Sequence, residues 1–256
     1  AVEGMPVIHV QEPRTMARIA ETWVREGFKV FKVKLKGESK RDIEAVRCIL
    51  GVSPDIQIFI VDANYGYKEE ADLIEAGQEL SRMGVRYFQN PIKRPLSFYA
   101  ALSARMNIPF TCDNTAYWPK VKSVLARNAA QLVNLHPNCM GGIDLLYRVV
   151  DFAGTQGIAS IVGSSGHCGI QDKCFQKVAF TLNGELPSEE VGLNAYYSES
   201  RQEFYKCNYG YPSILKNDLK IHAGKILDSD EEGFGIDVDR DRLEKMIEKK
   251  WTYSLS

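Results

Sequence analysis

Side chains that can transfer protons or bind cations recur along this sequence at a regular spacing. Each stands near the end of a short apolar segment, and the steps between successive groups are 28, 27, 24 and 23 residues. The five groups are Lys34, Asp62, Gln89, Asp113 and His136. This spacing predicts one polar group per repeated structural unit, gathered at one site. The alternative is that these strand-end residues only cap helices or form turns.

Two lysines share one face of an extended segment. Residues 28–35 read FKVFKVKL, and alternation along a strand puts Lys32 and Lys34 on the same side. Neighbouring ammonium groups repel each other, and burial disfavours charge, so both effects lower the pKa of a lysine. We therefore expect a base that works near neutral pH. In the alternative, the strand simply ends where both lysines reach solvent.

Oxygen-bearing side chains follow three successive apolar segments. Asp62, Gln89 and Asp113 would offer two carboxylates and one amide oxygen, a donor set that suits a hard cation such as Mg²⁺. Helix capping by the two aspartates is the competing explanation.

A zinc site is a further alternative. His136, Cys139, His167, Cys168 and Cys112 could approach one another, and nitrogen and sulfur ligands favour Zn²⁺. Their spacing matches no common zinc motif, and free cysteines are often core residues.

The elements that must position these groups alternate between helix and strand. Apolar periodicity predicts helices over residues 13–27, 39–52, 68–84, 96–106, 118–129, 142–157 and 169–184. Apolar segments between them predict strands over residues 28–35, 57–64, 87–91, 109–114, 130–136 and 159–164. An earlier strand is expected in the segment MPVIHV.

This alternation is typical of an α/β fold with a parallel sheet. So many strands within residues 1–184 favour a closed, TIM-like (β/α)7β barrel. An open doubly wound sheet is possible, but no GxGxxG or GxxxxGK[ST] motif follows any strand.

The remaining residues, 185–256, depart from the alternation and are expected to pack on the barrel as part of one domain, 1–256. Residues 194–214 are aromatic and are expected to form irregular loops. Their tyrosines suit an interface with a capping domain or another subunit, or a stacking surface for a ligand; they are Tyr196, Tyr197, Tyr205, Tyr209 and Tyr211. Residues 218–239 predict a short β segment with a glycine turn, and 240–250 an exposed helix.

Composition excludes several classes of protein. The chain has 256 residues, 45% hydrophobic, with 32 basic and 33 acidic side chains, which argues against disorder and gives no electrostatic case for nucleic acid or a membrane surface. No apolar run approaches the roughly 18 residues of a membrane helix, and AVEGMPVIHVQEPR is not typical of a signal peptide. Six cysteines without a CxxC pair indicate free thiols in a reducing compartment, and so a cytoplasmic protein.

Several segments together resemble the enolase superfamily, in its mandelate racemase and muconate lactonizing enzyme branch. The resemblance covers nearly the whole chain and follows the order of the family's C-terminal barrel. The segments are FKVKLKG, VDAN, FQNP, CDNT, VNLHPNCMGGI, GSSGHCGI and GKILDSDEEGFGIDVDRDRLEK. Each motif is weak alone, but their order and spacing together are specific.

The resemblance implies roles for individual residues. Lys34 would be the catalytic acid or base, with Lys32 as its neighbour. Asp62, Gln89 and Asp113 would hold Mg²⁺, or Mn²⁺ in its place. His136 and His167 stand where other members have a second proton-transfer group and a glutamate. Substrate contacts are expected from Asn64, Asn114 and Ser164.

This sequence also departs from the family pattern. Gln89 replaces a usual glutamate, which removes one negative charge and should weaken metal binding. His136 replaces a lysine or aspartate and keeps a group that can carry a proton. Gly163 stands where racemases have a histidine. The α+β capping domain of the family is not apparent before the first strand, as expected if the chain is a fragment, if the cap comes from elsewhere, or if the protein has lost it.

The resemblance predicts an enzyme that removes a proton α to a carboxylate from a small acid, with a metal stabilising the enolate. Such enzymes are racemases, epimerases, cycloisomerases or acid dehydratases, and the residues do not choose among them. A homo-oligomer is also implied. The alternative, favoured by Gln89, is an altered barrel that binds a small acid without turnover.

Overall fold

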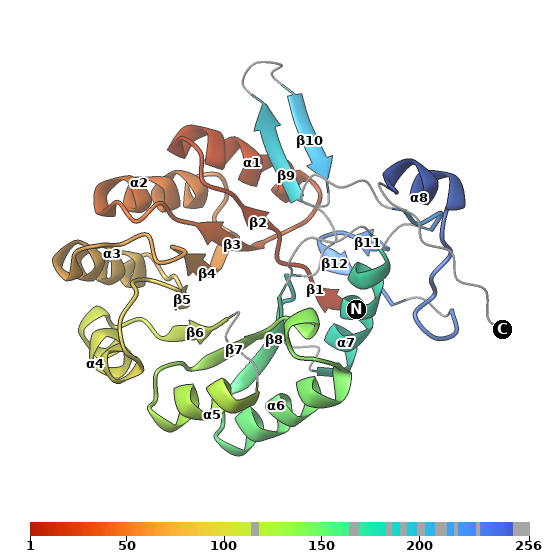
Figure 1. The fold of residues 1–256 in the computed structure, drawn as a ribbon. Helices are drawn as coiled ribbons and strands as arrows, with labels where there is room; N and C mark the ends of the chain where they lie inside the picture. Colours follow the sequence, from red (N-terminus) through yellow and green to blue (C-terminus); the bar gives the residue numbers. More distant parts are fainter. Residues whose placement is uncertain are drawn as a thin grey trace.

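A computed structural model describes residues 1–113, 118–163, 169–182, 186–189, 194–198, 203–207, 214–217, 220–228 and 231–247. Seven parallel strands form one sheet in sequence order (Figure 1). They are β2 (Val7–Ile8), β3 (Val30–Lys34), β4 (Gln57–Asp62), β5 (Tyr87–Gln89), β6 (Phe110–Cys112), β7 (Leu132–Leu135) and β8 (Ala159–Val162).

A helix follows each strand of this sheet, and the helices surround the strands in a ring (Figure 1). They are α1 (Pro13–Arg25), α2 (Ser39–Leu50), α3 (Glu70–Arg82), α4 (Leu96–Met106), α5 (Trp118–Ala126), α6 (Ile143–Thr155) and α7 (Ile170–Leu182). The alternation predicted from the sequence is confirmed, with each boundary within a few residues. Across the described residues, every helix falls short, in length or in hydrophobicity, of what crossing a bilayer requires.

The helices form because each carries an apolar stripe that the sheet can cover. In α1, Met16, Ile19, Ala20 and Trp23 lie at helical spacing and are buried. Proline at the first position of α1 already has the backbone angle of a helix. Strands such as β4, buried from Ile58 to Asp62, are apolar on both faces because helices cover one side and the barrel interior the other.

An eighth short segment closes the ring of strands. Ser188 bridges Gly4 in parallel, its backbone N–H donates to the carbonyl of Glu3, and its carbonyl accepts from Met5. On the other side, the backbone N–H of Glu189 donates to the carbonyl of Val162 at the end of β8. Residues 186–189 therefore occupy the place of an eighth strand, and the (β/α)7β barrel is confirmed.

The barrel interior is apolar at one end and polar at the other. Met5, Phe59, Ile60, Leu132 and Ile161 come from opposite sides of the ring and form one buried cluster inside it. Polar residues follow these at the carboxyl ends of the strands. Side chains facing the helices form the larger core clusters outside the sheet.

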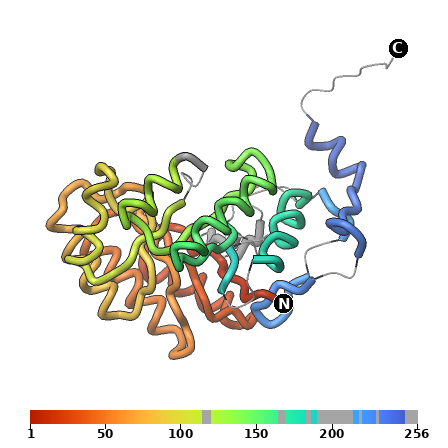
Figure 2. The backbone as a smooth tube through the Cα atoms, turned by 90° about the horizontal axis from the view of Figure 1, so that it is seen from below, coloured from red at the N-terminus to blue at the C-terminus, as the bar shows by residue number. Residues whose placement is uncertain are grey.

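Described parts of the C-terminal segment lie beside the barrel. β11 (Ile221–His222) and β12 (Lys225–Ile226) form a tight hairpin, and β12 also pairs with β1 (Val2–Glu3). Figure 2 shows this segment, in blue, on the side of the barrel that carries α7. α8 (Arg240–Met246) contains no buried residue. The predicted β segment, glycine turn and exposed helix are confirmed within these bounds.

The aromatic segment was predicted wrongly as loops. β9 (Asn194–Ser198) and β10 (Glu203–Cys207) form an antiparallel pair in which Tyr197 stands opposite Phe204 and Tyr196 opposite Tyr205. Aromatic residues favour strands. Pairing between two neighbouring strands can stabilise them even where apolar and polar residues do not alternate along the chain. Tyr209 and Tyr211 lie outside the described residues.

Candidate active site

Lys32 and Lys34 both point into the polar end of the barrel, as their spacing on β3 predicts. The Lys32 Nζ lies 2.8 Å from Glu189 Oε1, 3.2 Å from Gln89 Oε1 and 3.5 Å from Asp62 Oδ2. The Lys34 Nζ lies 2.6 Å from Asp62 Oδ2. The Lys32 side chain is 3% exposed and that of Lys34 19%, so the alternative in which both lysines reach solvent is wrong.

The predicted lowering of the lysine pKa is wrong for Lys32. Burial alone would lower the pKa of this group, but the carboxylates of Glu189, Asp62 and Asp113 outweigh burial and hold the pKa above its usual value. Lys32 therefore keeps its proton at neutral pH. It is a fixed positive charge at the centre of the site, and the neighbouring lysine is the better candidate for proton transfer.

Asp62, Gln89 and Asp113 stand at the ends of three neighbouring strands. Strand register aligns Lys34 with Asp62 and Asp62 with Gln89. The Gln89 Nε2 donates to Asp62 Oδ2 at 3.0 Å, and Asp62 Oδ1 accepts from the backbone N–H of Asn64 at 2.9 Å. These three predicted metal ligands are all at most 4% exposed and face the barrel interior.

His136 follows β7 and pairs with Asp113. Its Nε2 lies 2.8 Å from Asp113 Oδ1, and its side chain is 6% exposed. A carboxylate only accepts hydrogen bonds, so Nε2 is the donor. Asn90 donates to the other oxygen of Asp113 at 3.0 Å. Asp113 thus holds the imidazole in one orientation.

Two residues of this site were not predicted. Asn134 donates through Nδ2 to Glu189 Oε1 at 2.7 Å, and its side chain is fully buried. Asn134 lies on β7 two residues before His136, which follows the strand, so the alternation applied to the lysines could have found it. Glu189 stands 27 residues after Val162, and the repeat spacing could have found it had a further strand been expected.

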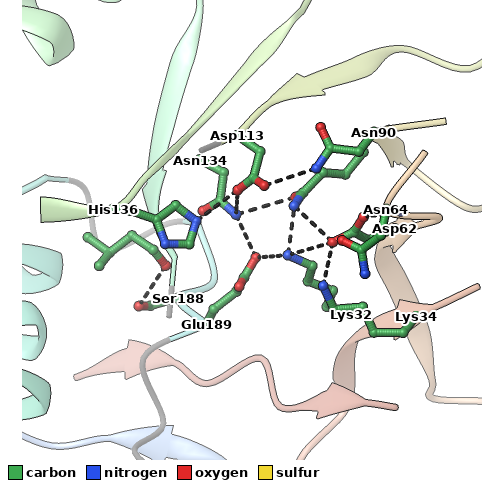
Figure 3. A network of polar contacts seen from close by, with 12 residues as sticks. Lys32, Lys34, Asp62, Asn64, Asn90, Asp113, Asn134, His136, Ser188 and Glu189 are labelled. Carbon is green, nitrogen blue, oxygen red and sulfur yellow. Dashed lines mark hydrogen bonds and ion pairs between the residues drawn. The ribbon is translucent and has the colours of Figure 1, made fainter. Parts of the chain in front are cut away.

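The proton-transfer candidates lie at opposite ends of this network. Figure 3 shows Lys34 with Asp62 at one end and His136 with Asp113 at the other, with Lys32, Asn134 and Glu189 between them. Their strands, β3 and β7, are four steps apart in a ring closed by an eighth segment. The two groups therefore approach the barrel axis from opposite sides.

The other predicted site residues have different outcomes. Asn64 is exposed beside the network, and its contact with Asp62 is through the backbone. Asn114, Ser164 and His167 lie outside the described residues. Of the zinc alternative, Cys112 is in the layer between the sheet and the helices, Cys139 is exposed, and Cys168 also lies outside the described residues.

The donor set fits a weakly held magnesium ion. Asp62, Gln89 and Asp113 supply only oxygen ligands, and Mg²⁺ can be held by one or two carboxylates together with water and substrate. Within the described residues, no three His, Cys, Asp or Glu side chains form a metal-binding group. The third member of the predicted donor set is an amide, and Gln89 directs its N–H rather than its oxygen towards Asp62.

Similarity to known proteins identifies the family. A family model described as "Enolase C-terminal domain-like" matches residues 15–242. The chain belongs to this family. It lies in the mandelate racemase and muconate lactonizing enzyme branch of the enolase superfamily, as the sequence motifs predicted.

Relatives in this superfamily carry out several reactions. The chain is 24% identical to N-succinyl-L-Arg/Lys racemase of Bacillus cereus, over 95% of this chain and 63% of that protein. It is 30% identical to arabinonate dehydratase of Saccharolobus solfataricus, over 84% of this chain and 54% of that protein. Muconate cycloisomerase from Pseudomonas fluorescens superposes with a TM-score of 0.80 at 20% identity, over 95% of this chain and 65% of that structure. The chain thus spans less than two thirds of the length of each of these three proteins.

Proposed function

We propose that this chain carries the site of an enzyme that removes and returns a proton at the carbon α to a carboxylate. The observation that carries the proposal is the position of Lys34 and His136 on opposite sides of one closed barrel. Two groups that reach a carbon from opposite faces suit 1,1-proton transfer, in which one removes the proton and the other returns it. A racemase or epimerase is therefore the reaction favoured here.

Each proton-transfer group has a carboxylate that orients it. Asp62 holds the Lys34 Nζ at 2.6 Å, and Asp113 holds the His136 Nε2 at 2.8 Å. These contacts fix where each group stands before substrate binds, which reduces the entropy lost on reaching the reactive geometry. Lys32, protonated and buried between them, places positive charge close to where an enolate would develop.

Asp62, Gln89 and Asp113 would hold Mg²⁺ in this proposal. When bound, the ion supplies positive charge to the carboxylate oxygens of the substrate as the α proton leaves. The chain's own residues orient the acid, hold the proton at Lys34 or His136, and exclude water through the buried contacts described above.

The relatives support the general class of reaction and do not favour one member of it. One is named a racemase, one a dehydratase and one a cycloisomerase. All act on acids whose names imply a small carboxylate substrate. A dehydratase would use the second group to protonate a leaving hydroxyl rather than the α carbon, so the products distinguish it from an epimerase.

The experiment is a screen for hydrogen–deuterium exchange. The protein is incubated in D₂O with Mg²⁺ and single enantiomers of α-substituted carboxylic acids, including N-acylated amino acids and sugar acids. Mass spectrometry should detect one deuterium at the α carbon of at least one acid, with appearance of the opposite configuration. The Lys34→Ala/His136→Ala variant is the control and should show neither. Absence of exchange from every acid would contradict the proposal.

A second candidate function is an acid-binding barrel without turnover. The observation that favours it is the amide of Gln89, which directs an N–H at Asp62 and removes one charge from the cation site. Calorimetry separates the two candidates. Acid binding with neither Mg²⁺ binding nor exchange would support the binding barrel, whereas Mg²⁺ binding with exchange supports the enzyme.

A further inference from the structure

Gly163 lies against the two residues that carry one side of the site. A Cβ built on Gly163 would come within 2.6 Å of His136 Nε2, 2.8 Å of His136 Cε1 and 2.6 Å of Asn134 Oδ1. Contacts this short do not occur between real side chains. Gly163 is not among the glycines with positive φ, so its backbone does not demand glycine. The constraint is the space that a side chain would take.

Neither neighbour can give way without losing a hydrogen bond. His136 is fixed to Asp113 at 2.8 Å and is 6% exposed. Asn134 is fixed to Glu189 at 2.7 Å and is fully buried. Closely packed interiors transmit such displacements instead of absorbing them. A methyl group at 163 would therefore move the imidazole off Asp113, the amide off Glu189, or both.

We propose that Gly163 is a positioning residue for His136. By having no side chain at the end of β8, it leaves the slot that the imidazole from the end of β7 occupies. In this slot His136 meets Asp113 on the side of the barrel opposite Lys34. The catalytic consequence rests on the function proposed above, whereas the steric coupling between positions 163 and 136 does not.

The proposal predicts an effect on one face of the substrate only. Displacing His136 should impair proton transfer on its own side, while Lys34 and Asp62 on the far side of the network are untouched. A small displacement of a catalytic group can lower a rate by about 10²-fold. A general loss of structure would instead lower exchange from both enantiomers.

The experiment compares Gly163→Ala with a matched control, Gly154→Ala. Gly154 lies in α6, and a Cβ there meets nothing within 4 Å. Two quantities are measured in each variant: the ¹H–¹⁵N imidazole signals of the chain's four histidines, assigned by single substitutions, and α-proton exchange in D₂O from each enantiomer of the acid found by the screen.

In Gly163→Ala, the His136 signal should shift and exchange from one enantiomer should fall about 10²-fold, with the other within about twofold of the unsubstituted protein. Gly154→Ala should change neither quantity. An unmoved His136 signal, or an equal fall for both enantiomers, would overturn the proposal. If the unsubstituted protein exchanges no acid, the function proposed above fails, and the His136 signal alone decides whether the steric coupling holds.

A further variant keeps the test decisive if Gly163→Ala does not fold. The new methyl group would strike the side chains of both His136 and Asn134, so the rescue removes both. Folding of Gly163→Ala/Asn134→Ala/His136→Ala where Gly163→Ala alone fails would support the coupling. Failure of both, with Asn134→Ala/His136→Ala folding, would overturn it.

Discussion

Lys32 shows how charge balance, not burial alone, sets the behaviour of a buried lysine. Its ammonium contacts Glu189 at 2.8 Å, and the two residues are 157 positions apart in the sequence. The alternation along β3 predicted that Lys32 and Lys34 share a face. No local pattern could reveal the distant carboxylate that helps to raise the pKa of Lys32, and that is why the predicted lowering of this pKa was wrong.

Removing this buried charge should destabilise the fold. Lys32→Met leaves Glu189 buried without its cation, which should lower the free energy of unfolding by about 3–5 kcal/mol. Lys32→Met/Glu189→Met should recover part of the loss, because no carboxylate is then left unpaired at 189. Denaturant unfolding measures both.

The control is Lys29→Met, on the same strand-forming segment. Lys29 pairs with Asp55 at 3.0 Å, but the side chains are 58% and 63% exposed. Lys29→Met should lower the free energy of unfolding by about 0–1 kcal/mol. Equal losses for Lys32→Met and Lys29→Met would show that the buried pair contributes no more than a surface one.

Gln89 should set the affinity for Mg²⁺. Gln89→Glu restores a third carboxylate between Asp62 and Asp113, and ligand charge is a main determinant of affinity for hard cations. Titration calorimetry should show Mg²⁺ binding tightened on the order of tenfold. Gln57→Glu adds the same charge at the exposed start of β4 and should leave the affinity for Mg²⁺ unchanged. If both variants bind Mg²⁺ as the unsubstituted protein does, residue 89 is not a ligand.

At the scale of elements, the loop after Lys34 is held by one buried carboxylate. Asp42, in the first turn of α2, accepts from the backbone N–H groups of Lys36, Gly37 and Glu38 and from the hydroxyl of Tyr67. These contacts tie the end of β3 to α2 and to the segment that follows β4. They keep the strand end that carries Lys34 in place.

Asp42→Asn should therefore lower stability by about 1–3 kcal/mol, because an amide cannot accept all four hydrogen bonds. Tyr67→Phe removes a single donor and should cost about 1 kcal/mol. Asp144→Asn, an exposed acid in the first turn of α6, is the matched control and should be nearly neutral. A neutral Asp42→Asn would mean that this carboxylate does not organise the loop.

Sequence periodicity predicted the elements where one face is apolar and the other polar. α4 over Leu96–Met106 has the predicted bounds, and the other helices differ by a few residues at their ends. The β9–β10 pair was missed because its residues show neither period, whereas the two strands pair along their whole length. The sequence of one strand does not reveal which strand it pairs with.

At the scale of the molecule, the barrel explains why separated residues meet. Repeated βα units bring strand ends from residues 34 to 136 to one end of a ring, so the spacing of the five polar groups was sufficient to predict that they gather there. A closed barrel was predicted, but the residues that close it were not. Residues 186–189 pair with β8 and with Gly4 through only a few backbone hydrogen bonds, and they bring Glu189 into the site.

In the proposed reaction, Lys34 and His136 act on opposite faces of one carbon. The direct measurement is α-proton exchange in D₂O from each enantiomer of an exchanging acid, in Lys34→Ala and in His136→Ala. Each variant should lose about 10²–10⁴-fold in exchange from one enantiomer, and the two variants should affect opposite enantiomers. Loss from the same enantiomer in both variants, or from neither, would contradict the account.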